Sequence, residues 1–174
     1  MKKILAFAGS NSQNSINKQL AIYAASLVDV EYDVADLNDY SLPIFSLEIE
    51  KKGFPSSAQE FNSLLSNYDG FVISLAEHNG SYSAVFKNIF DWVSRIDRKV
   101  FKEKPVLLMA TSPGGRGGKS VLESASNTFP HMGADIIATF SLPNFYDNFK
   151  NTEIIDPELN KTLLKSVKDL KRRI

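Results

Sequence analysis

Three polar turns hold the residues of this sequence whose types and spacing suit chemistry. Each turn follows a short apolar run and precedes a segment with helical periodicity. The first turn, Gly9–Asn17, is rich in hydroxyl and amide side chains, which can donate hydrogen bonds to an anion. The second, Ala76–Ser83, carries a carboxylate and an imidazole, and the third, Thr111–Lys119, has four glycines within five positions. Together the three turns predict a site for a polar ligand.

The first turn suits a phosphate group. It leaves a predicted strand and enters a predicted helix, so backbone N–H groups and the positive end of the helix dipole face it. The hydroxyls of Ser10, Ser12 and Ser15 and the amide of Asn17 add further donors. The turn has no Lys or Arg, and the Walker and Gly-x-Gly-x-x-Gly patterns are absent, which disfavours an ATPase or a dinucleotide-binding protein. The alternative is an ordinary turn with Ser15 as the helix N-cap.

The other two turns also admit two interpretations each. Glu77 and His78, at the carboxyl end of a strand, suit a polar heteroaromatic ligand or acid–base catalysis. A solvated loop punctuated by Asn79-Gly80 is the alternative. The glycines of the third turn would let the backbone approach a flat ligand, with Arg116 and Lys119 near any anionic group. There the alternative is a flexible surface loop.

Alternating strand and helix patterns position these turns. Short apolar runs predict five strands, at Ile4–Ala8, Tyr32–Leu37, Gly70–Leu75, Pro105–Ala110 and Ala134–Phe140. Helical periodicity predicts helices at Leu20–Val28, Ser56–Tyr68 (capped by Ser56 or Ser57), Ser83–Arg95, Lys119–Phe129 and Leu159–Leu170. Segments Asn38–Pro55 and Asn144–Asp156 are predicted to be connections. This order predicts one α/β domain, residues 1–174, with a parallel sheet and its ligand at the carboxyl ends of the strands.

Composition excludes several classes of protein. Lys plus Arg and Asp plus Glu number 20 each, and this balance argues against a nucleic-acid partner. There is no cysteine and there are only two histidines, so thiolate chemistry, iron–sulfur clusters and His-rich metal sites are excluded. No segment approaches the roughly 18 apolar residues of a membrane span, which predicts a cytoplasmic protein without a membrane partner. Any redox chemistry would therefore rest on a bound cofactor.

The turns and the helix after the second one resemble the NADPH-dependent FMN reductase family over about residues 1–140. Gly9-Ser10 with Ser15 and Asn17 resembles the phosphate loop of that family. Glu77-His78-Asn79-Gly80-Ser81, followed by Lys87-Asn88 and Asp91-Trp92, resembles its flavin-binding signature, and Ser112-Pro113-Gly114-Gly115 resembles its third flavin loop. Three positions depart from the family pattern: Ser12 replaces an Arg, Ala76 a Pro and His78 a Tyr.

The resemblance implies a flavodoxin-like three-layer α/β/α fold, strand order 2-1-3-4-5, with one noncovalent FMN. It implies ping-pong transfer from NADPH or NADH through FMN to a small-molecule acceptor: a quinone, azo compound, flavin or metal oxyanion. No catalytic side chain is assigned, because the cofactor carries the chemistry. The resemblance places phosphate contacts at Ser10, Ser12, Ser15, Ile16 and Asn17, and ring contacts at Glu77, His78, Asn79, Gly80, Ser81, Ser112, Gly114 and Gly115.

The same resemblance implies a homodimer or homotetramer. Its interface would involve the helix that carries Asp91, Trp92 and Arg95, although core packing is an equally good interpretation of Trp92. Two other functions stay open: a flavodoxin-like electron carrier and a flavin-free binding or regulatory protein on the same fold. The zero net charge disfavours the carrier, because such carriers are usually acidic.

Overall fold

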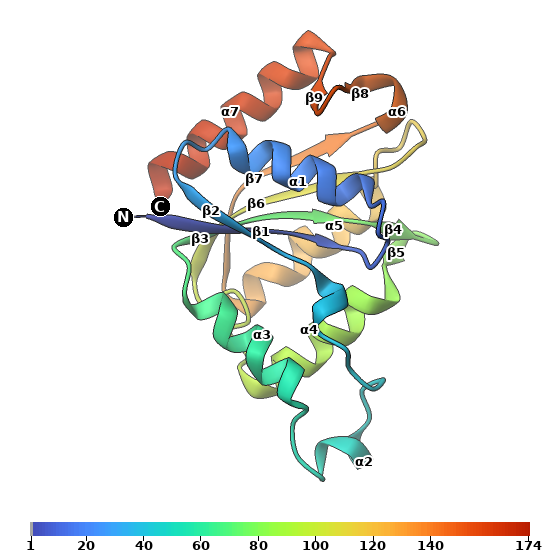
Figure 1. The fold of residues 1–174 in the computed structure, drawn as a ribbon, viewed down its shortest axis with the longest axis vertical. Coiled ribbons are helices and arrows are strands. Elements are labelled where there is room, and N and C mark those ends of the chain that lie inside the picture. The colour runs from blue at the N-terminus through green and yellow to red at the C-terminus, as the bar shows by residue number, and fades with distance from the viewer. Residues whose placement is uncertain (1) are drawn as a thin grey trace.

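A five-stranded parallel sheet organises the computed structural model, which describes residues 2–174. Its strands lie in the order β2-β1-β3-β6-β7 (Figure 1), which confirms the predicted order 2-1-3-4-5 for the five main strands. Their bounds are β1 Lys3–Gly9, β2 Glu31–Ala35, β3 Gly70–Leu75, β6 Lys104–Thr111 and β7 Ala134–Leu142. All the pairings in this sheet are parallel, so the carboxyl ends of the strands meet at one edge.

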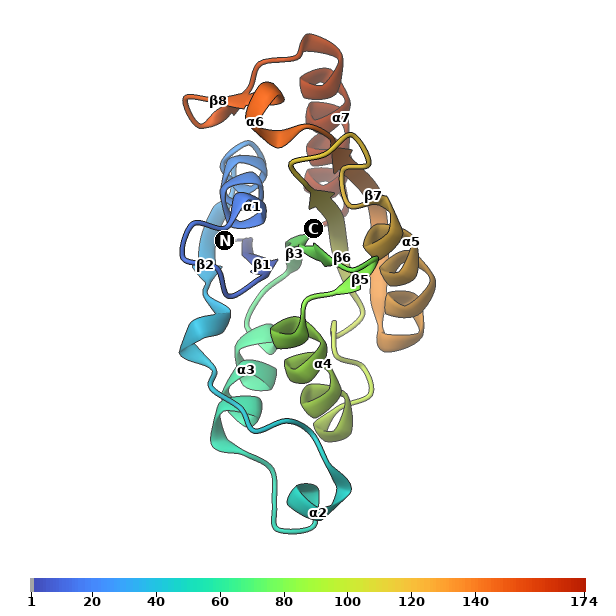
Figure 2. The same cartoon turned by 90° about the vertical axis from the view of Figure 1, so that its right-hand side faces the viewer.

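Helices cover both faces of the sheet and create two hydrophobic cores. The core on one face includes residues of α1 (Ile16–Ser26) and α7 (Pro157–Arg173). The core on the other includes residues of α3 (Ser56–Ser66), α4 (Ala84–Ile96) and α5 (Lys119–Thr128). Figure 2 views this arrangement from the carboxyl ends of the strands. Burial on both faces explains why the central strands are continuously apolar in sequence.

Side-chain caps begin several of the helices. Ser15 caps α1, Ser83 caps α4 and Asp156 caps α7, each by accepting a backbone N–H of the first turn. The predicted cap of α3 is wrong: Pro55 holds that position and makes no side-chain cap bond, while Ser56 is the first helical residue. None of the helices in residues 2–174 is long and apolar enough to cross a membrane.

Short elements lie mainly in segments predicted to be loops or connections, although Leu37 was predicted to end a strand and Phe129 to end a helix. The second turn contains a small antiparallel hairpin, β4 (Glu77–His78) and β5 (Ser81–Tyr82). The connection after β2 contains η1 (Leu37–Asp39) and α2 (Leu47–Glu50), and η2 (Phe129–Met132) follows α5. The segment after β7 contains α6 (Phe145–Asn148) and a second hairpin, β8 (Phe149–Lys150) and β9 (Glu153–Ile154). Elements of two to four residues have too few positions to show periodicity.

The connection between β2 and α3 packs against α4 and buries Trp92 completely. The indole Nε1 donates a hydrogen bond to the Pro43 carbonyl oxygen at 2.8 Å, and the Phe45 ring meets the indole edge-on at 5.0 Å. The Asn88 side chain accepts the Phe45 backbone N–H at 2.9 Å. The core-packing interpretation of Trp92 is therefore confirmed.

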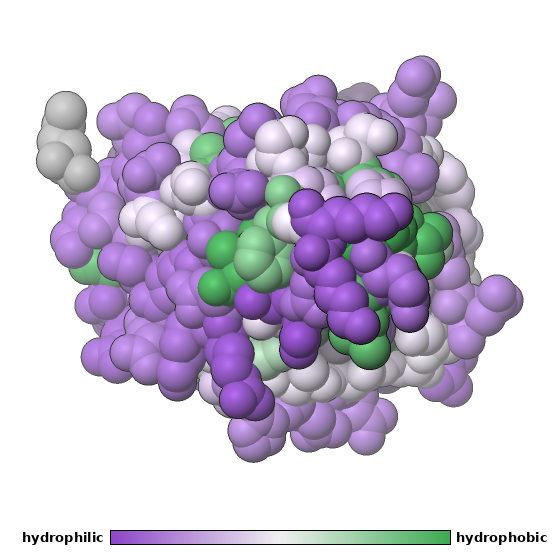
Figure 3. Space-filling view, turned by 90° about the horizontal axis from the view of Figure 1, so that it is seen from below, coloured by the Kyte–Doolittle hydropathy of each residue, from purple (hydrophilic) through white to green (hydrophobic). Residues whose placement is uncertain are grey.

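The same connection exposes apolar side chains. Ile44 is 75% exposed, Leu47 55% and Phe54 39%. Figure 2 shows α2 extending beyond α3 and α4, and Figure 3 views that end of the molecule, where apolar residues lie among hydrophilic ones.

Candidate functional site

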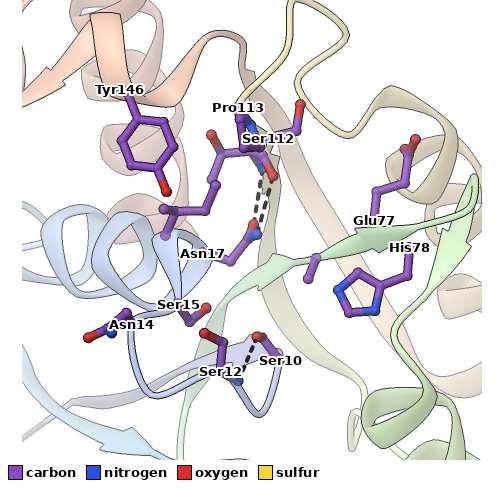
Figure 4. A pocket seen from close by; sticks show the side chains of 13 residues that line it. Ser10, Ser12, Asn14, Ser15, Asn17, Glu77, His78, Ser112, Pro113 and Tyr146 are labelled. Carbon is purple, nitrogen blue, oxygen red and sulfur yellow. Dashed lines mark hydrogen bonds between the residues drawn. The ribbon is translucent and has the colours of Figure 1, made fainter.

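A cavity of about 320 Å³ opens at the carboxyl edge of the sheet, where the three polar turns meet. Thirteen residues line it: Ser10, Ser12, Asn14, Ser15, Ile16, Asn17, Ala76, Glu77, His78, Thr111, Ser112, Pro113 and Tyr146. Figure 4 shows the turn after β1 on one side of this cavity and Glu77 with His78 on the other. The predicted convergence of the three turns is confirmed, since each supplies part of the lining.

Ser15 and Ser10 organise the turn after β1. Ser15 Oγ accepts the Lys18 backbone N–H at 3.1 Å, and its own N–H donates to the Ser12 carbonyl oxygen at 3.2 Å. Ser10 Oγ accepts the Ser12 N–H at 3.2 Å. In each case the serine oxygen is the acceptor, so its hydroxyl hydrogen can still be donated to an anion. The turn is thus capped by Ser15, as the alternative predicted, and also keeps donors for a ligand.

Asn17 ties helix α1 to two strands of the sheet beneath the cavity. Its Oδ1 accepts hydrogen bonds from Ser74 Oγ at 2.7 Å and from the Thr111 N–H at 3.0 Å. Its Nδ2 donates to the Thr111 carbonyl oxygen at 3.2 Å. Only 3% of Asn17 is exposed, so these bonds join α1 to β3 and β6 inside the protein. One amide hydrogen stays available for a ligand.

Glu77 connects the hairpin of the second turn to α5. Its Oε2 accepts the Val121 N–H at 3.0 Å, in the first turn of α5. The N-cap of that helix is Gly118, which has no side chain, so the Glu77 carboxylate takes over the capping bond. A negative charge at this end is also favoured by the helix dipole. Glu77 therefore holds the cavity wall in place.

The rest of the second turn forms a tight two-residue loop. His78 pairs with Ser81 across the hairpin, and Asn79 and Gly80 both have positive φ, 52° and 75°. This conformation is typical of the Asn-Gly turns that join paired strands. The His78 side chain reaches the cavity and is exposed, whereas Asn79, Gly80 and Ser81 lie outside its lining.

The third turn is attached to the segment after β7. The Phe145 N–H donates to the Ser112 carbonyl oxygen at 3.1 Å, and the Asn144 N–H donates to the Gly114 carbonyl oxygen at 3.0 Å. Ser112 lines the cavity, whereas Gly114 and Gly115 lie outside its lining. A Cβ added at Gly114 would meet no other atom within 4 Å, so this backbone is open to a ligand.

The sequence analysis named no contact at five lining residues: Asn14, Ala76, Thr111 and Pro113, which belong to the three turns, and Tyr146, which lies outside them. Tyr146 lies on α6, is 59% exposed and lines the cavity (Figure 4). Parallel strands end at the same edge of a sheet, so the segment that follows β7 had to pass near the other turns. The sequence offered little to single out Tyr146, since Phe145 and Phe149 are aromatic residues of the same segment.

The cation beside the first turn is already paired. Lys18 Nζ lies 2.5 Å from Asp36 Oδ2, just beyond the end of β2. The Lys18 ammonium and the Asn38 backbone N–H lower the pKa of the Asp36 carboxyl. The residues that line the cavity include no Lys or Arg. Any anion here would therefore be bound by neutral donors and the α1 dipole.

Comparison with known proteins identifies the family. A model of the NADPH-dependent FMN reductase family matches residues 2–147. The chain belongs to the NADPH-dependent FMN reductase family. Relatives of this chain include a 2-hydroxy-1,4-benzoquinone reductase from a Burkholderia species, 36% identical over 118 residues. That match covers 66% of this chain and 63% of the relative.

A second relative and a solved structure agree with this assignment. The quinone reductase of Escherichia coli is 27% identical over 118 residues, covering 67% of this chain and 63% of that enzyme. The matched region thus spans less than two thirds of either relative. The flavoenzyme NAD(P)H:(acceptor) oxidoreductase FerB from Paracoccus denitrificans has a TM-score of 0.78 at 22% identity, covering 99% of this chain and 97% of that one. The expected flavodoxin-like fold is confirmed, as is an oxidoreductase family with FMN and NAD(P)H as its cofactors.

The lining fits FMN chemically. Serine hydroxyls and the N-terminus of α1 provide donors for a phosphate group. Next to the lining, the backbone at Gly114 is open, since a Cβ added there would meet no atom within 4 Å. Ser12 is part of the lining and brings a hydroxyl where the family pattern has an Arg.

Proposed function

We propose that this protein is an FMN-dependent NAD(P)H oxidoreductase whose acceptor is a quinone. The observation that carries the proposal is the cavity at the carboxyl edge, where three turns supply hydroxyl, amide and backbone donors without a cation. Two relatives named for quinone reduction favour a quinone over the azo compounds, flavins and metal oxyanions that the resemblance also implies. A cytoplasmic location stays a prediction.

In this proposal, the residues of the chain bind and orient the reactants. Bound FMN would supply two-electron transfer between NAD(P)H and the acceptor. Ser10, Ser12 and Ser15 would hold its phosphate with the N-terminus of α1, and Asn17 would fix that turn against β3 and β6. Glu77 would keep the hairpin against α5. Donor and acceptor would use one open face in turn, which is ping-pong kinetics.

We also propose that the molecule forms a homodimer through the connection after β2 and α4. Ile44, Leu47 and Phe54 support this, because they expose apolar side chains from one connection, and exposed apolar surface favours association. Arg95 holds this connection by an ion pair with Glu50, with Arg95 Nε 2.7 Å from Glu50 Oε1. Asp91 pairs with Lys87 on α4 at 2.7 Å. Trp92 would support the interface from beneath.

One experiment tests the enzymatic proposal. The purified protein is titrated with FMN, and its absorption spectrum is then recorded before and after anaerobic addition of NADPH. We expect FMN binding, bleaching of the flavin band by NADPH and recovery of the band on addition of a quinone. Failure to bind FMN would favour a flavin-free binding protein. Binding of FMN with almost no NADPH oxidation would favour an electron carrier.

A further inference from the structure

The phosphate of FMN would carry nearly two negative charges into a cavity without a cation in its lining. Lys18 lies on the first turn of α1, but its ammonium is bound to Asp36. Ser12 occupies the family position of an Arg. Neutral hydrogen-bond donors must therefore provide what a cation would otherwise contribute, and each further donor matters for affinity.

Tyr146 offers such a donor from outside the three turns. Its ring is largely exposed and is not part of either hydrophobic core, yet it lines the cavity. Figure 4 shows its hydroxyl directed into the cavity, on the side of Asn17 and the turn after β1 and away from Glu77 and His78. An exposed aromatic side chain that turns toward a polar cavity suits contact with a ligand.

The backbone around Tyr146 is held firmly. Phe145 is buried in the core beside α1, and its N–H is bonded to Ser112. Asn144 adopts a left-handed conformation with φ 47°, and its N–H is bonded to Gly114. Asn148 Nδ2 donates to the Pro143 carbonyl oxygen at 2.8 Å. The four-residue helix α6 thus presents Tyr146 from a fixed position.

We propose that the Tyr146 hydroxyl donates a hydrogen bond to the phosphate group of bound FMN. The proposal rests on the proposed function, since it concerns a contact to the cofactor of that function. A phenol donates a charge-assisted hydrogen bond to a phosphate oxygen without adding charge to the site. This contact would compensate in part for the Arg that Ser12 replaces.

Dissociation constants for FMN and riboflavin test the contact, because riboflavin lacks the phosphate. Both flavins are titrated by fluorescence quenching into the wild type and into the Tyr146→Phe variant. We expect the variant to weaken FMN binding about tenfold, the effect of losing one charge-assisted bond, and to leave riboflavin binding unchanged. The Tyr32→Phe variant is the matched control, because Tyr32 lies on β2 outside the cavity. It should change neither constant.

Several outcomes would overturn the contact. If Tyr146→Phe weakens the binding of FMN and riboflavin equally, Tyr146 contacts a part of the flavin other than the phosphate. If its affinity for FMN is unchanged, Tyr146 makes no contact with the cofactor. The Lys18→Met variant tests whether the Lys18 ammonium binds the phosphate instead. If this variant loses affinity for FMN but not for riboflavin, and Tyr146→Phe loses none, the proposal is also overturned. If the wild type binds no FMN, the proposed function fails instead, so the two failures are distinguishable.

Discussion

At the scale of single residues, Asn17 shows that a residue of a binding motif can serve the fold as well as the ligand. Its side chain makes three hydrogen bonds to groups on β3 and β6, while it remains in the lining of the cavity. Removing such a buried amide is costly in free energy, because each buried partner left without a hydrogen bond keeps its full desolvation penalty.

The Asn17→Ala variant should therefore lose stability as well as affinity. It leaves Thr111 N–H and Ser74 Oγ without their partner inside the protein. We expect the free energy of unfolding to fall by about 2–4 kcal/mol. Urea denaturation measures this, with Asn127→Ala on the exposed side of α5 as the control. A loss of less than about 0.5 kcal/mol, the usual range for surface changes, would contradict the structural role of Asn17.

The Lys18–Asp36 pair gives stability a pH dependence. Lys18 lowers the pKa of Asp36 in the folded protein below its ordinary value. The ionised carboxylate thus stabilises the fold above the unfolded-state pKa, near 4, and this contribution disappears as pH falls through the lower folded-state pKa. We expect the stability difference between the wild type and Asp36→Asn to shrink from pH 7 to pH 3. Urea denaturation at both pH values measures it, and an unchanged difference would contradict the ion pair. Asp36→Asn made in a Lys18→Met background is the control, where the pH effect should be smaller, because only the bonds from Asn38 still lower the pKa of Asp36.

At the scale of elements, the third turn and the end of β7 act as one unit. Hydrogen bonds join Ser112 to Phe145 and Gly114 to Asn144, and Ser141 Oγ donates to the Gly117 carbonyl oxygen at 2.9 Å. The glycines of this turn therefore have different tasks. Gly117 allows close packing against β7, whereas Gly114 faces open space.

Two glycine variants separate these tasks. In Gly117→Ala the new Cβ would lie 2.4 Å from Ser141 Oγ, and the φ of 59° disfavours any side chain. We expect a loss of about 1–3 kcal/mol in unfolding free energy, measured by urea denaturation. Gly114→Ala is the matched control, and its stability should stay within about 0.5 kcal/mol of the wild type. Equal losses in both variants would contradict this assignment of tasks.

At the scale of the whole molecule, two regions of surface depart from the general pattern. One is the cavity at the carboxyl edge, and the other is the exposed apolar group on the connection after β2. These regions lie on different elements, so the proposed binding and association can be tested separately.

The association prediction places a charge at Ile44, the most exposed of the three apolar side chains on this connection. We expect Ile44→Glu to convert the dimer into a monomer, because an exposed apolar contact becomes a buried unpaired carboxylate. Sedimentation equilibrium measures the mass. Ile155→Glu is the control: Ile155 is 51% exposed but lies beyond β9, away from this surface. A wild type that sediments as a monomer would refute the dimer.

Local patterns in the sequence were sufficient to predict the main strands and helices. The runs at β3 and β6 are mostly apolar because helices cover both faces of a central strand. An apolar run in the sequence therefore predicts a strand that is buried on both faces. The order of strands and helices then implied a parallel sheet, and a parallel sheet implied one edge where the turns meet. The convergence of Ser15, Glu77 and Ser112 on one cavity follows from that order.

Only the tertiary structure showed which contacts the individual side chains make. The bonds of Asn17 and Glu77 join groups 94 and 44 positions apart in the chain, which local periodicity cannot report. The burial of Trp92 depends on a connection that returns to α4, and the place of Tyr146 depends on where β7 ends. The sequence by itself determined which elements form, because that depends on neighbouring residues. Which side chains meet depends on distant ones, and only the folded chain brings those together.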